Sequence, residues 1–251
     1  IYLLYKACHE AGFKVIMTGE GADELLGGYH WFDGDRRMRP LLHLPRPIRA
    51  ALARLPIPAS AAAHRVLANG TADHVQRYWL WQQVADPDQL TALLNSPSPD
   101  GHPERSGVLL AAQSKDRQGG GAEGGVHPLD QFLFLESQTR MIDFINFEVD
   151  RMSMANSVEA RPPFLDHELW EFCAGLPPGC KLSPNGNKLL LRLGMRGLLP
   201  SSVLNQPKRG LASPHAEWLR GDLPAWAENA LHPTALAETG YFNPVEVVRL
   251  C

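Results

Sequence analysis

Acidic residues lie among small residues directly after a short apolar run near the start of the chain. The run is Val15–Met17, and the segment that follows, Thr18–Glu24, reads Thr-Gly-Glu-Gly-Ala-Asp-Glu. This order predicts a buried parallel strand whose C-terminal end opens into a site, where α/β proteins bind their ligands. Gly19 and Gly21 would let the backbone approach a ligand and present N–H groups to an anion. The alternative is a solvated turn with exposed acids.

The three acids of this segment, Glu20, Asp23 and Glu24, are a poor surface for a bare phosphate. They are consistent with a divalent cation between them and a phosphate, since Mg²⁺ prefers oxygen ligands and is commonly shared with substrate phosphates. Asp23 is the candidate magnesium ligand, and a turn-stabilising cap is its alternative role. Glu20, at the tip of the loop, is the candidate proton acceptor, and a metal-bridging carboxylate is its alternative.

A second chemically dense segment, Asp150–His167, reads Asp-Arg-Met-Ser-Met-Ala-Asn-Ser-Val-Glu-Ala-Arg-Pro-Pro-Phe-Leu-Asp-His. Its charged side chains could orient a substrate, or Arg–carboxylate pairs among them could fix the geometry of the loop. The sequence does not separate these two roles for the charged residues Asp150, Arg151, Glu159, Arg161 and Asp166.

A third segment, Asn187–Arg192, reads Asn-Lys-Leu-Leu-Leu-Arg and predicts a helix that ends near Arg196 before Gly197 and Pro200. Lys188 would lie in its first turn, where a lone lysine is usually a solvated charge. Arg192 lies one turn later, as a second cation or as a structural partner.

The elements that must position these residues are mostly helical. We expect a helix over 1–11 with its apolar side formed by residues such as Leu3 and Leu4, a strand over about 13–18 and a short helix over 22–28. That order is the second half of a βαβ unit. A long amphipathic helix is expected over 128–147, with Phe144 on its apolar side.

The remaining connections are predicted as follows. Residues 150–165 are expected to form a structured loop with a short helix, and Asp166 to cap a helix that runs to about Leu176. Segment 96–127 is rich in Pro, Ser and Gly and is predicted to be a flexible insertion, either family-variable or a lid.

Composition narrows the class of protein. The 251 residues carry a formal net charge of −3, which gives no indication of nucleic acid or an anionic membrane as a partner. No apolar run approaches the roughly 20 residues that span a bilayer. The four cysteines are far apart and lack CxxC spacing, which favours reduced thiols in a cytoplasmic protein: Cys8, Cys173, Cys180 and Cys251.

Taken together and in this order, the three segments resemble the C-terminal synthetase domain of glutamine-dependent asparagine synthetases. Thr18 stands where that family usually has Ser, and Pro162 where it usually has Val. Leu199-Pro200 and Lys208-Arg-Gly continue the match. The resemblance implies an α/β fold of the adenine-nucleotide alpha-hydrolase (PP-loop ATPase) type, of which this chain would carry the last strand region and a mostly helical C-terminal half.

The resemblance also implies a reaction. ATP would activate the side-chain carboxylate of aspartate as β-aspartyl-AMP with release of pyrophosphate, and ammonia derived from glutamine would then displace AMP. Lys188 matches the family lysine that holds the departing pyrophosphate, and Glu20 the glutamate assigned to intermediate formation or breakdown. ATP and its pyrophosphate would be bound at Thr18, Gly19, Gly21, Asp23, Lys188 and Arg192, and Mg²⁺ at Asp23.

Two parts that the family needs do not occur in this sequence. One is a Ser-Gly-Gly-x-Asp-Ser phosphate loop, and the other is an N-terminal glutaminase domain that begins with a catalytic Cys. The chain is therefore interpreted as part of a synthetase domain (1–251) that would be inactive alone, with the glutaminase domain as partner and a homodimer as an expected assembly. The alternatives are a β-lactam synthetase, an amidotransferase for peptide or cell-surface glycan precursors, and a non-catalytic fragment.

Overall fold

The computed structural model describes residues 1–56, 60–71, 73–83, 87–95, 126–206 and 223–250. Two compact units make up the chain. Unit 1 comprises Ile1–Gln82 and Gly107–Lys208, and unit 2 comprises Gln83–Ser106 and Arg209–Cys251. Most of the expected insertion, residues 96–125, and the Lys208-Arg-Gly match lie outside the described residues.

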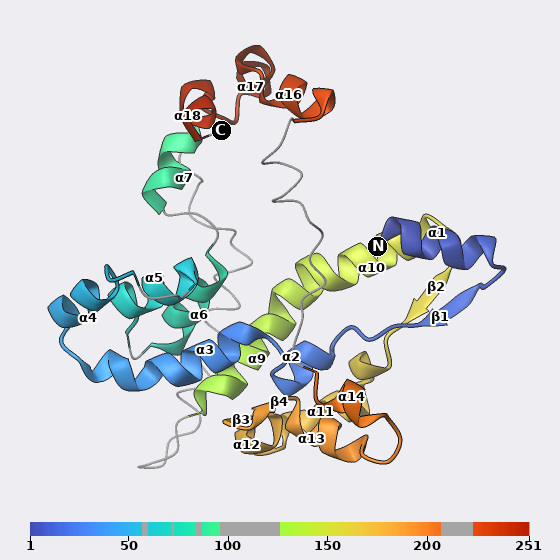
Figure 1. Ribbon diagram of the computed structural model, residues 1–251. Coiled ribbons are helices and arrows are strands. Elements are labelled where there is room, and N and C mark those ends of the chain that lie inside the picture. The colour runs from blue at the N-terminus through green and yellow to red at the C-terminus, as the bar shows by residue number, and fades with distance from the viewer. Residues whose placement is uncertain (57–59, 72, 84–86, 96–125, 207–222, 251) are drawn as a thin grey trace. The chain divides into compact units, whose positions relative to one another are not determined.

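Unit 1 begins with a helix, a short strand and a loop into a second helix, as predicted (Figure 1). Gly12, with φ +85°, lets the chain turn directly after the first helix. The strand β1 (Val15–Met17) pairs in parallel with β2 (Glu159–Arg161), so the parallel arrangement is confirmed. The helices are α1 (Tyr2–Glu10), α2 (Ala22–Leu26) and α3 (His30–Met38).

Three details of this region differ from prediction. The strand β2 forms inside the segment expected to be a loop with a short helix. The strand β1 is not buried: Met17 is 76% exposed, and only Ile16 is partly buried against the cluster of Tyr5, Val149 and Val158. Likewise α1 buries Tyr5, whereas Leu3 on the predicted apolar side is 76% exposed. Among the described residues, α1 and α10 pack near one face of this two-stranded sheet, so the apolar pattern alone misjudged which side is inward.

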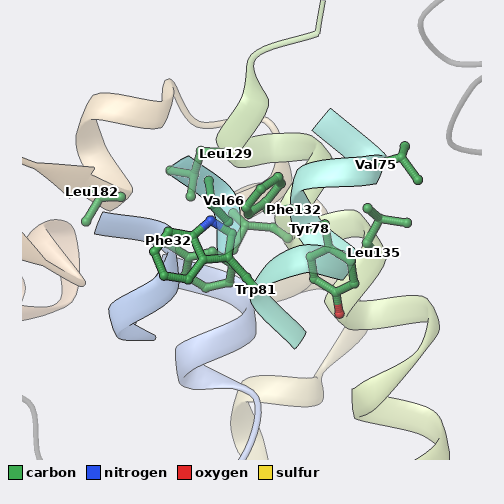
Figure 2. Packing of buried hydrophobic residues seen from close by; sticks show 10 residues of the cluster. Phe32, Val66, Val75, Tyr78, Trp81, Leu129, Phe132, Leu135 and Leu182 are labelled. Carbon is green, nitrogen blue, oxygen red and sulfur yellow. The ribbon is translucent and has the colours of Figure 1, made fainter. Parts of the chain in front are cut away.

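The main core of unit 1 lies among α3, α5, α6 and α9, and Figure 2 shows its aromatic side chains facing one another. Tyr78 and Phe132 meet edge to face with ring centroids 5.6 Å apart. A bidentate ion pair joins two of these helices, because buried Arg77 donates to both carboxylate oxygens of Asp35 at 2.8 and 3.2 Å. The elements of this region are η1 (Arg39–His43), α4 (Arg46–Leu52), α5 (Ala61–Asn69), α6 (His74–Gln82) and α9 (Pro128–Gln138).

The long helix expected over 128–147 is interrupted. After α9, a π-helical segment, η2 (Met141–Asn146), leads into α10 (Phe147–Met154). Wider π turns change the angular spacing of side chains. Leu129, Phe132 and Met141 are buried, as an amphipathic helix requires, but Phe144 is 55% exposed, so its placement on the apolar side was wrong.

The end of unit 1 is a set of short elements. Asp166 caps α11 as predicted, since its Oδ1 accepts hydrogen bonds from the backbone N–H groups of Glu168 and Leu169 at 3.0 and 3.1 Å. A tight hairpin and a helix follow. The elements are η3 (Pro163–Leu165), α11 (His167–Ala174), α12 (Pro178–Lys181), β3 (Leu182–Ser183), β4 (Gly186–Asn187), α13 (Leu189–Gly194) and α14 (Ser201–Leu204).

Unit 2 is helical where it is described. The Asn95 side chain ties its two segments together by donating to the carbonyl of Phe242 at 2.8 Å. Its helices are α7 (Pro87–Leu93), α16 (Ala225–Leu231), α17 (Pro233–Thr239) and α18 (Pro244–Leu250). No helix in the described ranges is long and apolar enough to cross a membrane. Cys8, Cys173 and Cys180 are free thiols.

The core of unit 1 should depend on Phe132, which is 1% exposed at the centre of the cluster. Phe132→Ala is expected to lower the free energy of unfolding by about 3–5 kcal/mol, because it removes buried apolar surface and leaves a cavity. Chemical denaturation followed by circular dichroism measures the change. Phe172→Ala is the matched control, since Phe172 is 62% exposed. Equal destabilisation by both substitutions would contradict this placement of the core.

Candidate active site

An ion pair joins two of the three chemically dense segments. Lys188 Nζ lies 3.0 Å from Asp23 Oδ1, and both side chains are 19% exposed. Asp23 lies in the first turn of α2, and Lys188 directly precedes α13. The structure therefore brings the acidic loop and the lysine together, although they are far apart in the sequence.

Unusual backbone conformations place both partners. Gly21, the N-cap of α2, has φ +92°, and a Cβ built there would lie 2.4 Å from Leu165 Cδ2. Glycine is thus required both by the left-handed backbone and by the close packing of η3. Lys188 has φ +49°, a conformation uncommon for a side chain of this kind. It is the N-cap of α13, so its predicted place in the first turn was wrong.

The start of the acidic loop contains two buried side-chain oxygens without a hydrogen-bond partner among the described residues. They are Thr18 Oγ1 and Glu20 Oε2. The Thr18 backbone N–H continues the β1–β2 ladder by donating to the carbonyl of Arg161 at 3.0 Å. Buried polar atoms are almost always hydrogen-bonded in folded proteins, so these two oxygens are candidates for contact with a bound polar group.

Glu20 also lies near α1. Burial raises the pKa of Tyr5, and the negative charge of Glu20 raises it further. The Glu20 carboxylate is therefore within electrostatic reach of the Tyr5 hydroxyl on α1.

Glu24 points away from its two neighbouring acids. It is 1% exposed and accepts a short hydrogen bond from the hydroxyl of Tyr29. The guanidinium of Arg140 lies over the Tyr29 ring, 4.5 Å from its centroid. Among the described residues no group of three acidic, His or Cys side chains is arranged to hold a metal ion, and magnesium binding at Asp23 stays a prediction.

Arg192 is engaged by protein carbonyls. Its Nε donates to the carbonyl of Asn187 at 3.1 Å, and its Nη2 donates to Asn187 Oδ1 at 3.2 Å. Its Nη1 donates to the carbonyl of Leu204 and, at 3.2 Å, to that of Gln206. The sequence left two roles open for Arg192, a second ligand-binding cation and a structural partner. These contacts favour the structural role.

The charged residues of the middle segment are dispersed. Asp150 and Arg151 lie exposed on α10, where the Arg151 guanidinium lies over the Phe147 ring, 5.2 Å from its centroid. Glu159 and Arg161 form an exposed ion pair with an N–O distance of 2.7 Å along β2. Asp166 is a helix cap. For Glu159, Arg161 and Asp166 these contacts fit the loop-structuring role.

A cavity of about 930 Å³ lies beside this site within unit 1. The β3–β4 hairpin, the start of α3 and the exposed side of α13 form its walls, and Arg192 and Asn187 are among its lining residues. No sequence pattern indicated this cavity, because its walls come from segments with no shared periodicity.

Comparison of the sequence with known proteins assigns the chain to a family. The sequence model of the asparagine synthase family matches residues 1–251. The chain belongs to the asparagine synthase family. No solved structure matches it.

Curated relatives share similar segments. A putative glutamine-hydrolysing asparagine synthetase of Mycobacterium tuberculosis (strain H37Rv) is 32% identical over 218 residues, covering 85% of this chain and 32% of the relative. Glutamine-hydrolysing asparagine synthetase 1 of Bacillus subtilis is 26% identical over 219 residues, covering 86% and 33%. Amidase chyE of Penicillium rubens is 29% identical over 252 residues, covering 88% and 35%. The chain thus spans about a third of the length of these relatives.

Sequence reasoning missed the buried cluster behind the site. Glu136 on α9 is fully buried, accepts from Gln82 Nε2 at 3.0 Å and has an oxygen 3.9 Å from Arg140 Nη1. Burial raises the pKa of the Glu136 carboxyl to about 7. The nearby Arg140 guanidinium acts to lower this pKa, and the negative charge of Glu24 acts to raise it. A Glu four residues before an Arg on one helix was the available signal, yet that spacing usually marks an exposed pair.

Glu136 should make stability depend on pH. Its pKa is about 7 in the folded chain against 4.5 as the ordinary value. Between these pH values the folded state keeps a proton that the unfolded state has lost, so stability falls as pH rises through this window, by on the order of 3 kcal/mol in total. Glu136→Gln removes this dependence, so the variant should gain stability relative to the parent at pH 8 compared with pH 5.

Urea unfolding at both pH values measures that difference. Glu10→Gln is the control, because Glu10 is exposed on α1 and its side chain only forms a surface pair with Lys6. If Glu136→Gln and Glu10→Gln gave the same pH dependence, Glu136 would not be the buried titrating group.

Proposed function

We propose that this chain is the part of an ATP-dependent amide-forming ligase that holds the pyrophosphate of ATP and handles protons at the attacking nitrogen. The acceptor is aspartate, the intermediate is β-aspartyl-AMP, and the nitrogen is ammonia released from glutamine by a separate glutaminase domain. The contact between Lys188 Nζ and Asp23 Oδ1 is the observation that carries the proposal. Membership of the asparagine synthase family supports it.

In the first step the carboxylate of aspartate attacks the α-phosphorus, and the bond to the pyrophosphate oxygen breaks. Negative charge then develops on the leaving group. Fixed cations where that charge develops stabilise the transition state more than the ground state. Lys188 has this role, and Thr18, Gly19 and Gly21 supply hydroxyl and backbone N–H donors to the phosphates.

In the second step ammonia attacks the acyl carbon, and AMP leaves. The nitrogen of ammonia must lose one proton on the way to a neutral amide. Glu20 accepts it, because its Oε2 is buried and has no hydrogen-bond partner among the described residues. The acid next to the glycine pair is thus a catalytic residue, whereas Glu24 only fixes α2.

The residues fit a magnesium ion that is shared with substrate phosphates. Mg²⁺ in such sites uses one or two carboxylates and fills its other positions with water and phosphate oxygens. The partly buried carboxylate of Asp23 would be one protein ligand. When bound, the ion would neutralise phosphate charge and raise the leaving ability of pyrophosphate.

The products formed from ATP test whether the reaction is an adenylation. A protein that contains this chain together with a glutaminase domain should convert ATP to AMP and pyrophosphate in equal amounts, in a manner that depends on aspartate and on glutamine or ammonia. Chromatographic separation of the nucleotides and an enzymatic pyrophosphate assay measure both. Formation of ADP and phosphate would contradict adenylation.

Glu20→Gln tests the proton acceptor in the same protein. The amide keeps the shape of the side chain but cannot accept the proton, so amide formation should fall about 10²–10⁴-fold with nearly unchanged ATP affinity. Steady-state rates and ATP binding by calorimetry separate the two effects. Glu168→Gln on the surface of α11 is the control. An equal loss of affinity and rate would make Glu20 a ligand-positioning group.

A different acceptor is the second candidate. Two relatives carry the name amidase: chyE, and chry2 of Gibberella zeae, which is 25% identical and covers 88% of this chain. The adenylation and proton-transfer residues would be unchanged, and only the carboxylate that is activated would differ. Pyrophosphate release that is stimulated by another carboxylic acid but not by aspartate would favour this candidate.

A further inference from the structure

The Asp23–Lys188 ion pair lies directly over Gly28. A Cβ built at Gly28 would lie 1.8 Å from Asp23 Oδ1 and 2.8 Å from Lys188 Cε. The backbone of Gly28 does not have a left-handed φ, so an alanine would fit the chain conformation itself. Glycine at this position is therefore explained by the space that the ion pair needs and not by backbone freedom.

A hydrogen bond ties the lysine segment to the same glycine. Asn187 Nδ2 donates to the carbonyl of Gly28 at 2.7 Å, and the Gly28 N–H donates to the carbonyl of Asp23 at 2.8 Å. Asn187 directly precedes Lys188, whose left-handed backbone turns the chain at this point. The backbone of Gly28 is thus hydrogen-bonded both to the segment of Asp23 and to the segment of Lys188.

Asn187 is itself held in place. Arg192 donates both to its backbone carbonyl and to its Oδ1, and it also donates to the carbonyls of Leu204, at the end of α14, and of Gln206. The planar guanidinium of arginine is preorganised, so little entropy is lost for each hydrogen bond that it forms with these groups. The chain of contacts therefore runs from α14 through Arg192 and Asn187 to Gly28.

We propose that Gly28 and Asn187 are positioning residues that set Lys188 against Asp23 before any ligand binds, and that Arg192 acts only by anchoring Asn187. The geometric part stands on the contacts of this chain alone. Its consequence for pyrophosphate rests on the proposed function. A lysine that is already placed needs no reordering when charge develops on the leaving group, which is the advantage of a preorganised site.

The first experiment fills the space over Gly28. Gly28→Ala should displace the ion pair, and the Lys188 amine should then react about two- to fivefold faster with an acetylating ester, since a partly exposed ion pair protects only weakly. Peptide mass spectrometry gives the rate, with Lys6, whose side chain is 54% exposed, as internal reference. Gly194→Ala is the matched control: nothing lies within 4 Å of its built Cβ.

The second experiment removes the tether and adds nothing over Gly28. Asn187→Leu keeps the size of the side chain but has no donor for the Gly28 carbonyl. It should raise the Lys188 acetylation rate by a similar factor. Asn185→Leu is the control, because Asn185 is exposed in the same hairpin turn. Circular dichroism should show the same helical signal for all four variants as for the parent chain, so that the acetylation rate reports on the site and not on unfolding.

Unchanged Lys188 reactivity in folded Gly28→Ala and Asn187→Leu chains would overturn the inference. If Gly28→Ala failed to fold, Asn187→Leu alone would decide it. In a protein that shows the proposed reaction, turnover should fall about 10²-fold in both variants and stay unchanged in both controls. Faster acetylation in a protein that never releases pyrophosphate would keep the positioning role and reject the proposed function, so the two failures are distinguishable.

Discussion

The candidate site depends on one partly buried ion pair between Asp23 and Lys188, because it is the contact by which the two motifs meet. Two charges that are each mostly removed from water must be paired or they destabilise the fold. The chain meets this demand with residues of very specific shape. Gly21 allows close packing of Leu165, Gly28 leaves room above its backbone, and Lys188 adopts a left-handed conformation that a helix interior would forbid.

The helix that carries Asp23 is fixed from its other side. Neighbouring residues on a helix do not face the same way, so Asp23 and Glu24 project in different directions. Glu24 reaches into the core and bonds Tyr29, whose ring packs under Arg140, and Arg140 in turn neighbours Glu136. A short helix of five residues has little stability of its own, so these buried contacts hold it in place. The chemistry on one face thus relies on a charge cluster on the other.

Local signals in the sequence were sufficient for some of this arrangement. The Asp166 cap follows from a side-chain oxygen ahead of two free N–H groups, and the parallel β1 strand follows from an apolar run before a glycine-rich loop. The strand β2 was missed because its three residues, Glu-Ala-Arg, are too few and too polar to show the alternation of apolar and polar residues that indicates a strand. The π-helical turn over Met141–Asn146 has no compositional signature, so Phe144 was assigned to the wrong side.

Roles that depend on three-dimensional neighbours were harder to predict. Asp23 was singled out by its place two residues after Gly21, but nothing in the sequence indicated that the neighbouring Glu24 is buried against other groups. Only packing against Tyr29 makes the distinction. Arg192 has the spacing of a second ligand-binding cation, but carbonyl oxygens around it use its donors. Burial of β1 and α1 depends on which elements lie against them, which a periodic pattern does not contain.

The paired state of Asp23 and Lys188 also bears on how such a site can be occupied. A bare anion would attract Lys188 and repel Asp23, and a bare cation would do the reverse. Either ion alone would therefore break the ion pair and gain a favourable contact with only one of the two residues. A metal–polyphosphate carries both signs of charge and offers each residue a new partner at once. Under the proposed function, the ion pair therefore discriminates against free phosphate and free metal, and it favours the combined ligand that adenylation requires.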